Sequence, residues 1–207
     1  MARLRCYFSF RSPYSWLAMK SLAKQGMQVG STLEYLPFIE PAGELAQRLY
    51  DMGGECLYRT MSPQKHLYIL GDIKRQAKEL GLTPKWPVDV DVDWSIPHKV
   101  FLVLTDDAIK QSFLLTCADK RFLEGKNIFN WGECQSILLQ WLDKTTAAQV
   151  IDDAQSEKGL SLMTDVCYQA YIDDVFGVPF FIAKREKYWG NDRLDRFVQH
   201  CRRMELV

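Results

Sequence analysis

The sequence has no excess of charge of either sign. Lysine and arginine together number 26, as do aspartate and glutamate, so the formal net charge is zero. Such a chain exerts no strong overall field on nucleic acid or on an anionic membrane. No stretch approaches the roughly 18 uninterrupted apolar residues that a membrane-spanning helix requires. We therefore expect no nucleic acid and no membrane among the partners.

The sequence also lacks a Cys-x-x-Cys motif, although it contains six cysteines. Their wide spacing predicts buried, reduced thiols in a reducing compartment, and hence a cytoplasmic protein. The first 15 residues contain arginine but no acidic residue, and in this they are superficially similar to a mitochondrial transit peptide. We interpret them instead as the first strand of the fold and the turn that follows it.

Signals for metal ions and nucleotides are absent as well. The run of alternating aspartates from Asp89 to Asp93 suggests a calcium loop, but an EF-hand needs glycine at its sixth position and glutamate at its twelfth. Those positions hold Trp94 and Val100. The three histidines are scattered, and no glycine-rich phosphate loop is present. We expect no metal and no nucleotide cofactor, and we interpret residues 89–93 as an exposed loop or edge strand.

The sequence opens with a strand, a helix and a second strand. Residues 4–10 alternate between apolar and other side chains, which is the period of a strand. Ser12 followed by Pro13 is a helix start, because serine caps and proline suits the first helical position. Gly26 ends this helix, and residues 31–39 form the second expected strand.

The remainder is helical in its middle and returns to strands at its end. We expect a helix from Ser62 to Gly81 with Leu67, Leu70, Ile73, Ala77 and Leu80 on one face. Further helices are expected over 98–124, 135–143, 146–157 and 160–175, with a loop from Trp86 to Pro97. The end predicts a strand over 180–183, a tight turn over 184–186, a return strand over 187–189 and a final helix capped by residues 190–192.

This order of elements predicts an α/β protein with a thioredoxin-like fold and a large inserted α-helical domain. Residues 1–40 and 176–207 are expected to form the thioredoxin-like domain. Residues 41–175 are expected to form the insertion.

The turn at Ser12-Pro13-Tyr14-Ser15 is the first candidate site. A helix N-terminus favours an anion, and thiol-redox proteins of this fold place Cys-x-x-Cys there. Ser-x-x-Ser cannot exchange disulfides, but Ser12 can donate a hydrogen bond to a bound thiolate. Such a bond contributes about 1.5–3 kcal/mol and the helix dipole about 0.3–1 kcal/mol, which together lower a thiol pKa by about one to three units. The alternative is that Ser12 only caps the helix.

Two segments near the end could complete this site. A proline that opens a strand opposite the turn predicts a cis Val178–Pro179 peptide bond. The backbone of Val178 could then pair with the backbone of a peptide-like ligand. Asn191 and Asp192 could either cap the last helix or bind an α-amino group.

The run YFSFRSPYSWLA from Tyr7 to Ala18 resembles the opening of 2-hydroxychromene-2-carboxylate isomerases and kappa-class glutathione transferases. The runs VFGVPFF from Val175 and YWGNDRL from Tyr188 resemble the ends of the same proteins, whose wider family includes DsbA-type disulfide oxidoreductases. The Gly-Asn-Asp-Arg sequence is more similar to the isomerases, because the transferases favour Gly-Ser-Asp-Arg.

The resemblance implies that glutathione is the cofactor and that Ser12 is the catalytic residue that meets its sulfur. Val178 would hold the cysteinyl part of glutathione, Asn191 and Asp192 its γ-glutamyl end, and Lys65 its glycyl end or the substrate carboxylate. Lys65 is equally well explained as a solvated helix-surface lysine. The full set of implied glutathione-binding residues is Ser12, Pro13, Tyr14, Lys65, Val178, Pro179, Gly190, Asn191 and Asp192. Family members are commonly homodimers, so a homodimer is expected.

The sequence departs from the family pattern at three places. Ser9 replaces a usual aspartate, Arg11 stands where small or apolar residues are common, and the loop Trp86 to Pro97 differs from the loop that lines the isomerase pocket.

The resemblance predicts a glutathione-dependent isomerase that acts on an aromatic-degradation intermediate, a small aromatic or conjugated carbonyl compound. A kappa-type transferase that conjugates electrophiles is the alternative, and a non-catalytic thiol or peptide binder is a third possibility.

Overall fold

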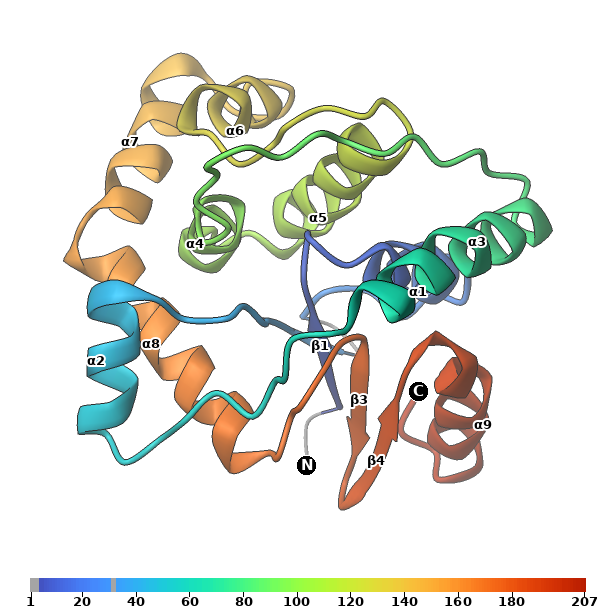
Figure 1. Cartoon of the computed structure of the whole chain (residues 1–207). Helices are drawn as coiled ribbons and strands as arrows, with labels where there is room; N and C mark the ends of the chain where they lie inside the picture. Colours follow the sequence, from blue (N-terminus) through green and yellow to red (C-terminus); the bar gives the residue numbers. More distant parts are fainter. Residues whose placement is uncertain (1–3, 31–32) are drawn as a thin grey trace.

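The computed structural model describes residues 4–30 and 33–207 and contains one four-stranded sheet (Figure 1). Its strands are β1 (Arg5–Phe8), β2 (Glu34–Pro37), β3 (Phe180–Ala183) and β4 (Glu186–Trp189). They lie in the order β2-β1-β3-β4, with β1 parallel to β2 and antiparallel to β3, and β3 antiparallel to β4. The two ends of the sequence therefore meet in one mixed sheet. This confirms the predicted α/β thioredoxin-like fold.

Helices cover both faces of this sheet (Figure 1). They are α1 (Pro13–Lys24), α2 (Gly43–Asp51), α3 (Pro63–Glu79), α4 (Ile96–Val103), α5 (Asp107–Phe122), α6 (Trp131–Leu138), α7 (Lys144–Gln155), α8 (Glu157–Ile172), the short 3₁₀ helix η1 (Asn191–Arg193) and α9 (Leu194–Arg203). Cys6 and Phe8 point into the larger core with α1 and α9, while Tyr7 points into a second core with α8. Alternate residues of β1 are thus buried on opposite sides.

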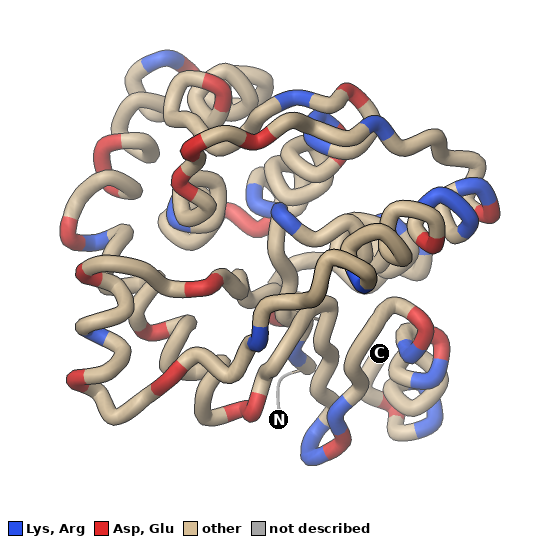
Figure 2. Tube along the Cα trace, viewed as in Figure 1, with Lys and Arg blue, Asp and Glu red and all other residues tan. Residues whose placement is uncertain are grey.

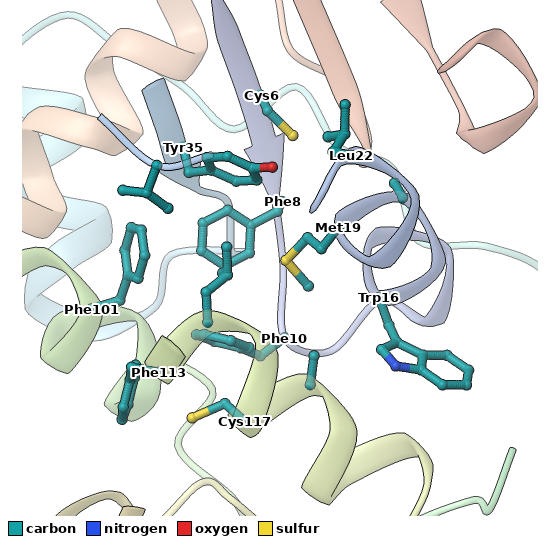
Figure 3. Close-up of a cluster of buried hydrophobic side chains, with 14 of the residues drawn as sticks. Cys6, Phe8, Phe10, Trp16, Met19, Leu22, Tyr35, Phe101, Phe113 and Cys117 are labelled. Carbon is teal, nitrogen blue, oxygen red and sulfur yellow. The ribbon is translucent and has the colours of Figure 1, made fainter. Parts of the chain in front are cut away.

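The larger core joins the sheet to the helical stretch (Figure 3). The ring of Phe8 contacts Phe101 of α4 at a centroid distance of 5.2 Å, and Phe10 meets Phe113 of α5 at 6.3 Å. All four rings are fully buried. Phe10 lies just before the Ser12 turn, so this packing fixes the point where the chain leaves the sheet. The division of the chain into domains at residues 40/41 and 175/176 stays a prediction.

The expected helix over 98–124 is wrong in one respect, because the structure has two helices there. Leu104 adopts an extended backbone after α4, and Asp106 then caps α5 by accepting a hydrogen bond from the Ile109 amide at 2.9 Å. A side chain that caps a new helix competes with continuation of the old one. The expected loop is also shorter, because α4 begins at Ile96 with Pro97 in its first turn.

Three other helices begin earlier than expected. Asn130, Asp143 and Ser156 cap α6, α7 and α8 through their side chains. The expected ranges are displaced towards the C-terminus by two to four residues, because the polar residues that cap these helices stand before the apolar period. The second strand, expected over 31–39, is observed only over Glu34–Pro37, and its expected first residues 31–32 lie outside the described part of the chain.

Helix α3 buries only part of the face that was expected to point inward. Ile73 and Ala77 are fully buried, but Leu67 and Leu70 are exposed. The buried stripe follows Ile69, Ile73 and Ala77 at a spacing of four residues, and Leu67 lies about 200° around the helix from Ile69. In the final helix the four residues expected to point inward are all buried: Leu194, Phe197, Val198 and Cys201.

Basic and acidic residues are interspersed along the chain trace (Figure 2). Among the described residues no helix combines the length and apolar character needed to cross a membrane.

Candidate active site

Ser12 begins α1 directly after the first strand of the sheet. Its amide donates to the carbonyl of Ser9 at 3.0 Å, which closes the turn. Its hydroxyl oxygen accepts a hydrogen bond from the Ser15 amide at 3.2 Å, and Pro13 occupies the first helical position. The capping role anticipated for Ser12 is therefore real, and it leaves the hydroxyl proton of Ser12 free to be donated elsewhere.

That proton is directed across the site toward Val178. The Ser12 Oγ donates to the Val178 carbonyl oxygen at 3.5 Å, although 166 residues separate the two in sequence. The Val178–Pro179 peptide bond is cis, as expected. Both Ser12 and Val178 are half-buried, so this junction reaches solvent. The structure thus brings together the two halves of the predicted site.

Ser15 has a different environment, although it completes the Ser-x-x-Ser spacing. It is fully buried, and its Oγ accepts a hydrogen bond from the Ser9 amide at 3.2 Å. Only the first hydroxyl of the pair therefore faces the junction with Val178.

Helix α3 links this turn to the segment after β4. The hydroxyl of Tyr14 donates to Asp72 at 2.7 Å, and the Gln76 amide donates to the same carboxylate oxygen at 2.7 Å. Burial and the bond to Asp72 raise the pKa of Tyr14. Partial burial would raise the pKa of Asp72, but the hydrogen bonds that Asp72 receives outweigh it and hold its pKa below the usual value.

Gln76 in turn accepts a hydrogen bond from the Asn191 Nδ2 at 2.8 Å. The Oδ1 of Asn191 is buried and has no partner among the described residues, so it is an acceptor available to a ligand donor. Gly190 has a φ of +97°, a backbone conformation that residues with a Cβ rarely adopt, so glycine is strongly favoured there. The expected side-chain cap at residues 190–192 is wrong, because neither Asn191 nor Asp192 caps the last helix.

Lys65 is the one predicted residue that the structure does not join to the others. It lies exposed in the first turn of α3, where its backbone amide donates to the Ser62 hydroxyl. Within residues 4–30 and 33–207, its ammonium group makes no hydrogen bond or ion pair.

His98 is not expected to bind a metal ion, and the structure shows that it holds the strand end against α4. It is fully buried on α4, where its Nε2 accepts from the Phe10 amide at 3.0 Å and its Nδ1 pairs with the Trp94 carbonyl at 2.7 Å. These bonds assign the proton to Nδ1 of the neutral ring. Burial lowers the pKa of His98 to about 4. A lone histidine in an apolar helix was the available sequence signal, but it did not identify the partners.

The loop before α4 is held by a buried ion pair. Arg121 is 3% exposed and makes two hydrogen bonds to Asp89, at 2.9 and 2.6 Å. Its guanidinium also lies 5.5 Å from the ring of Trp94. The aspartate run is a loop, as expected, and its first carboxylate is used to hold that loop against α5.

All six cysteines are free, and none lies in the turn at Ser12. Five are buried as expected, and Cys56 is half-buried. Burial raises the pKa of Cys201 to about 11 and those of Cys134 and Cys167 to about 12. These thiols are therefore protonated near neutral pH, when they are poor nucleophiles.

Residues 3–202 match the model of the DsbA-like thioredoxin domain. The chain belongs to this family. It also resembles the 2-hydroxychromene-2-carboxylate isomerase of Sphingobium xenophagum, with 25% identity over 191 residues that cover 91% of this chain and 92% of the relative. The expected family resemblance is thereby confirmed.

Solved structures show the same DsbA-like fold. A 2-hydroxychromene-2-carboxylate isomerase superimposes with a TM-score of 0.74 at 22% identity, covering 97% of this chain and 95% of the other. The cytosolic disulfide reductase DsbM from Pseudomonas aeruginosa, solved with GSH, gives 0.64 at 14% identity, covering 97% and 99%. In this chain the turn that begins α1 contains Ser12 and Ser15 at the Ser-x-x-Ser spacing, and it contains no cysteine.

Proposed function

We propose that this chain is a glutathione-dependent isomerase that acts on a conjugated carbonyl compound of aromatic degradation. The observation that carries the proposal is the position of Ser12, whose hydroxyl lies at the N-terminus of α1 and opposite the Val178 carbonyl. A site built this way can stabilise a thiolate that the protein itself does not supply.

Ser12 would hold that sulfur by donating its hydroxyl proton. The Ser12 Oγ lies 3.5 Å from the Val178 carbonyl oxygen, which is at the long limit for a hydrogen bond. A stronger acceptor can therefore replace Val178 at a small cost in free energy. A charge-assisted bond contributes about 1.5–3 kcal/mol, and the N-terminus of α1 adds about 0.3–1 kcal/mol. Together they lower the pKa of a bound thiol, ordinarily near ~8.5, by one unit or more.

The residues around Ser12 fit the rest of a glutathione molecule. The carbonyl of Val178 is available to a peptide amide once Ser12 turns to the sulfur. The buried, unpartnered Oδ1 of Asn191 suits an α-amino donor, and the exposed carboxylate of Asp192 adds the matching charge. When bound, glutathione would supply a thiolate that adds reversibly to the conjugated substrate, permits rotation about the saturated bond and leaves unchanged.

The relatives support this assignment in two ways. The curated relative at 25% identity is named an isomerase, and similarity to it extends over nearly the whole chain. A structural neighbour was solved with GSH. Because the Ser12 turn contains no cysteine, the disulfide chemistry in that neighbour's name does not transfer to this chain.

Calorimetry tests glutathione use directly. We expect saturable binding of glutathione at millimolar concentration, and weaker binding of ophthalmic acid, which has a methyl group in place of the thiol. Asn191→Ala should weaken binding of both ligands, because it removes the same acceptor from each. If wild-type protein binds neither ligand, the proposed function is wrong. Once a substrate is found, a product of unchanged mass identifies an isomerase, whereas an adduct with glutathione identifies a transferase.

A further inference from the structure

Arg11 immediately precedes Ser12 in the turn and brings a positive charge to that turn. Its backbone amide donates to the Ser9 hydroxyl at 3.3 Å, which fixes the main chain. Its guanidinium pairs with Glu40 at 2.7 Å and lies 4.7 Å from the ring centroid of Trp94. The segments that follow β1 and β2 and the loop before α4 therefore meet at the Arg11 guanidinium.

Trp94 is a fixed support for this cation. Its ring packs edge-on against Phe129 at a centroid distance of 4.6 Å and lies near the buried Arg121. Its carbonyl is bonded to the buried His98. A guanidinium that rests on an aromatic face loses little freedom when it binds a planar anion, because its orientation is already set.

The partner of this cation is exchangeable. The Arg11 and Glu40 side chains are 45% and 42% exposed, and an ion pair of that exposure contributes little to stability. Only one Nη of Arg11 bonds to Glu40 within the described residues, although a guanidinium offers five N–H donors arranged for a carboxylate. The Arg11 guanidinium therefore forms a carboxylate-binding site, and the Glu40 carboxylate occupies it.

We propose that Arg11, supported by Trp94, binds a carboxylate of the substrate beside the glutathione sulfur, and that Glu40 is the internal carboxylate which the substrate displaces. This inference rests on the proposed function, for which it names Arg11 as a residue that determines substrate specificity. No covalent step involves Arg11, so it determines specificity and does not react.

Glutathione thioethers test this subsite without knowledge of the substrate. The probes are S-benzylglutathione and its 2-, 3- and 4-carboxybenzyl derivatives, which place a carboxylate at three positions relative to the sulfur. Affinities are measured by calorimetry for wild-type protein, Arg11→Gln, Arg11→Lys and Glu40→Gln. Arg48→Gln is the control, because Arg48 also pairs with exposed glutamates, Glu44 and Glu157, but lies on α2.

We expect wild-type protein to bind at least one carboxybenzyl isomer about fivefold or more tightly than the benzyl conjugate. Arg11→Gln should abolish that preference, Arg11→Lys should retain part of it, and Glu40→Gln should increase it. Arg48→Gln should leave it unchanged, and unmodified glutathione should bind equally well to all five proteins.

Equal affinity for the benzyl conjugate and all three carboxylated isomers in wild-type protein would overturn the Arg11 subsite while leaving the proposed function intact. A preference that survives in Arg11→Gln would also overturn it. Failure of wild-type protein to bind glutathione or any conjugate would instead overturn the proposed function.

Discussion

Two serines three residues apart in the active turn have opposite surroundings. Ser12 is half-buried and faces Val178 across the site, whereas Ser15 is fully buried and bonds the Ser9 amide. Both spacing and residue type were readable from the sequence, and so was the helix cap. The bond from the Ser12 hydroxyl to the Val178 carbonyl was not predicted, because no local rule connects residues 166 positions apart.

Ser15→Ala should reduce stability without altering the chemistry of the site. It removes the acceptor for a buried amide, and a buried donor left without a partner costs about 1–3 kcal/mol. Urea unfolding should show this loss in the free energy of unfolding. A variant as stable as the wild type would mean that the Ser9 amide finds another partner.

Some features of the helices depend on neighbouring residues in the sequence, and others depend on residues far away in it. The caps at Asn130, Asp143 and Ser156 are encoded locally, and each marks a helix start that lies before the apolar period. The hydrogen bonds from the Phe10 amide to His98 and from Arg121 to Asp89 join segments 88 and 32 residues apart. Their residues are ordinary in sequence, and only the packed helices bring them into contact.

The burial of His98 should make the free energy of unfolding depend on pH under acidic conditions. Burial lowers its pKa from 6.5 to about 4, so between these pH values the unfolded chain binds a proton that the folded chain does not. The free energy of unfolding should therefore fall as the pH is lowered through this window, by about 3 kcal/mol when the window is crossed. Urea unfolding at pH 7, 5.5 and 4.5 measures this contribution.

His98→Gln keeps a donor and an acceptor but does not titrate, so it should flatten the pH dependence in that window. His66→Gln is the control, because His66 is exposed on α3. If the free energy of unfolding of His98→Gln depends on pH as steeply as that of the wild type, another group causes the pH dependence.

At the scale of the whole molecule, the two ends of the chain build one sheet and one site. This could be predicted because each end has a strong local pattern and β-α-β followed later by β-β-α has few ways to pair. The full set of buried residues on α3 could not be predicted from the sequence. It depends on the contacts of α3 with α1 and, through Asn191, with the segment after β4. Ile73, Ala77 and Leu80 lie inward as the periodicity predicts. Leu67 and Leu70 are exposed, because α3 has more apolar residues than these contacts cover.

The absence of cysteine from the site and the raised pKa values of the buried thiols predict a protein without dithiol activity. Wild-type protein should not accelerate the reduction of insulin by dithiothreitol. The double variant Ser12→Cys, Ser15→Cys restores the spacing of the redox proteins and should give measurable acceleration. Insulin reduction by the wild type at rates typical of thioredoxins would contradict the account of the site.

The central claim is that Ser12 stabilises a bound thiolate as well as capping α1. The decisive measurement is the pKa of glutathione bound to wild-type protein, Ser12→Ala and Ser15→Ala, followed by the ultraviolet absorbance of the thiolate at saturating ligand. Loss of a charge-assisted bond of about 1.5–3 kcal/mol should raise that pKa by about one to two units in Ser12→Ala. Ser15→Ala should change it far less. Equal pKa values in all three proteins would mean that Ser12 is a helix cap and nothing more.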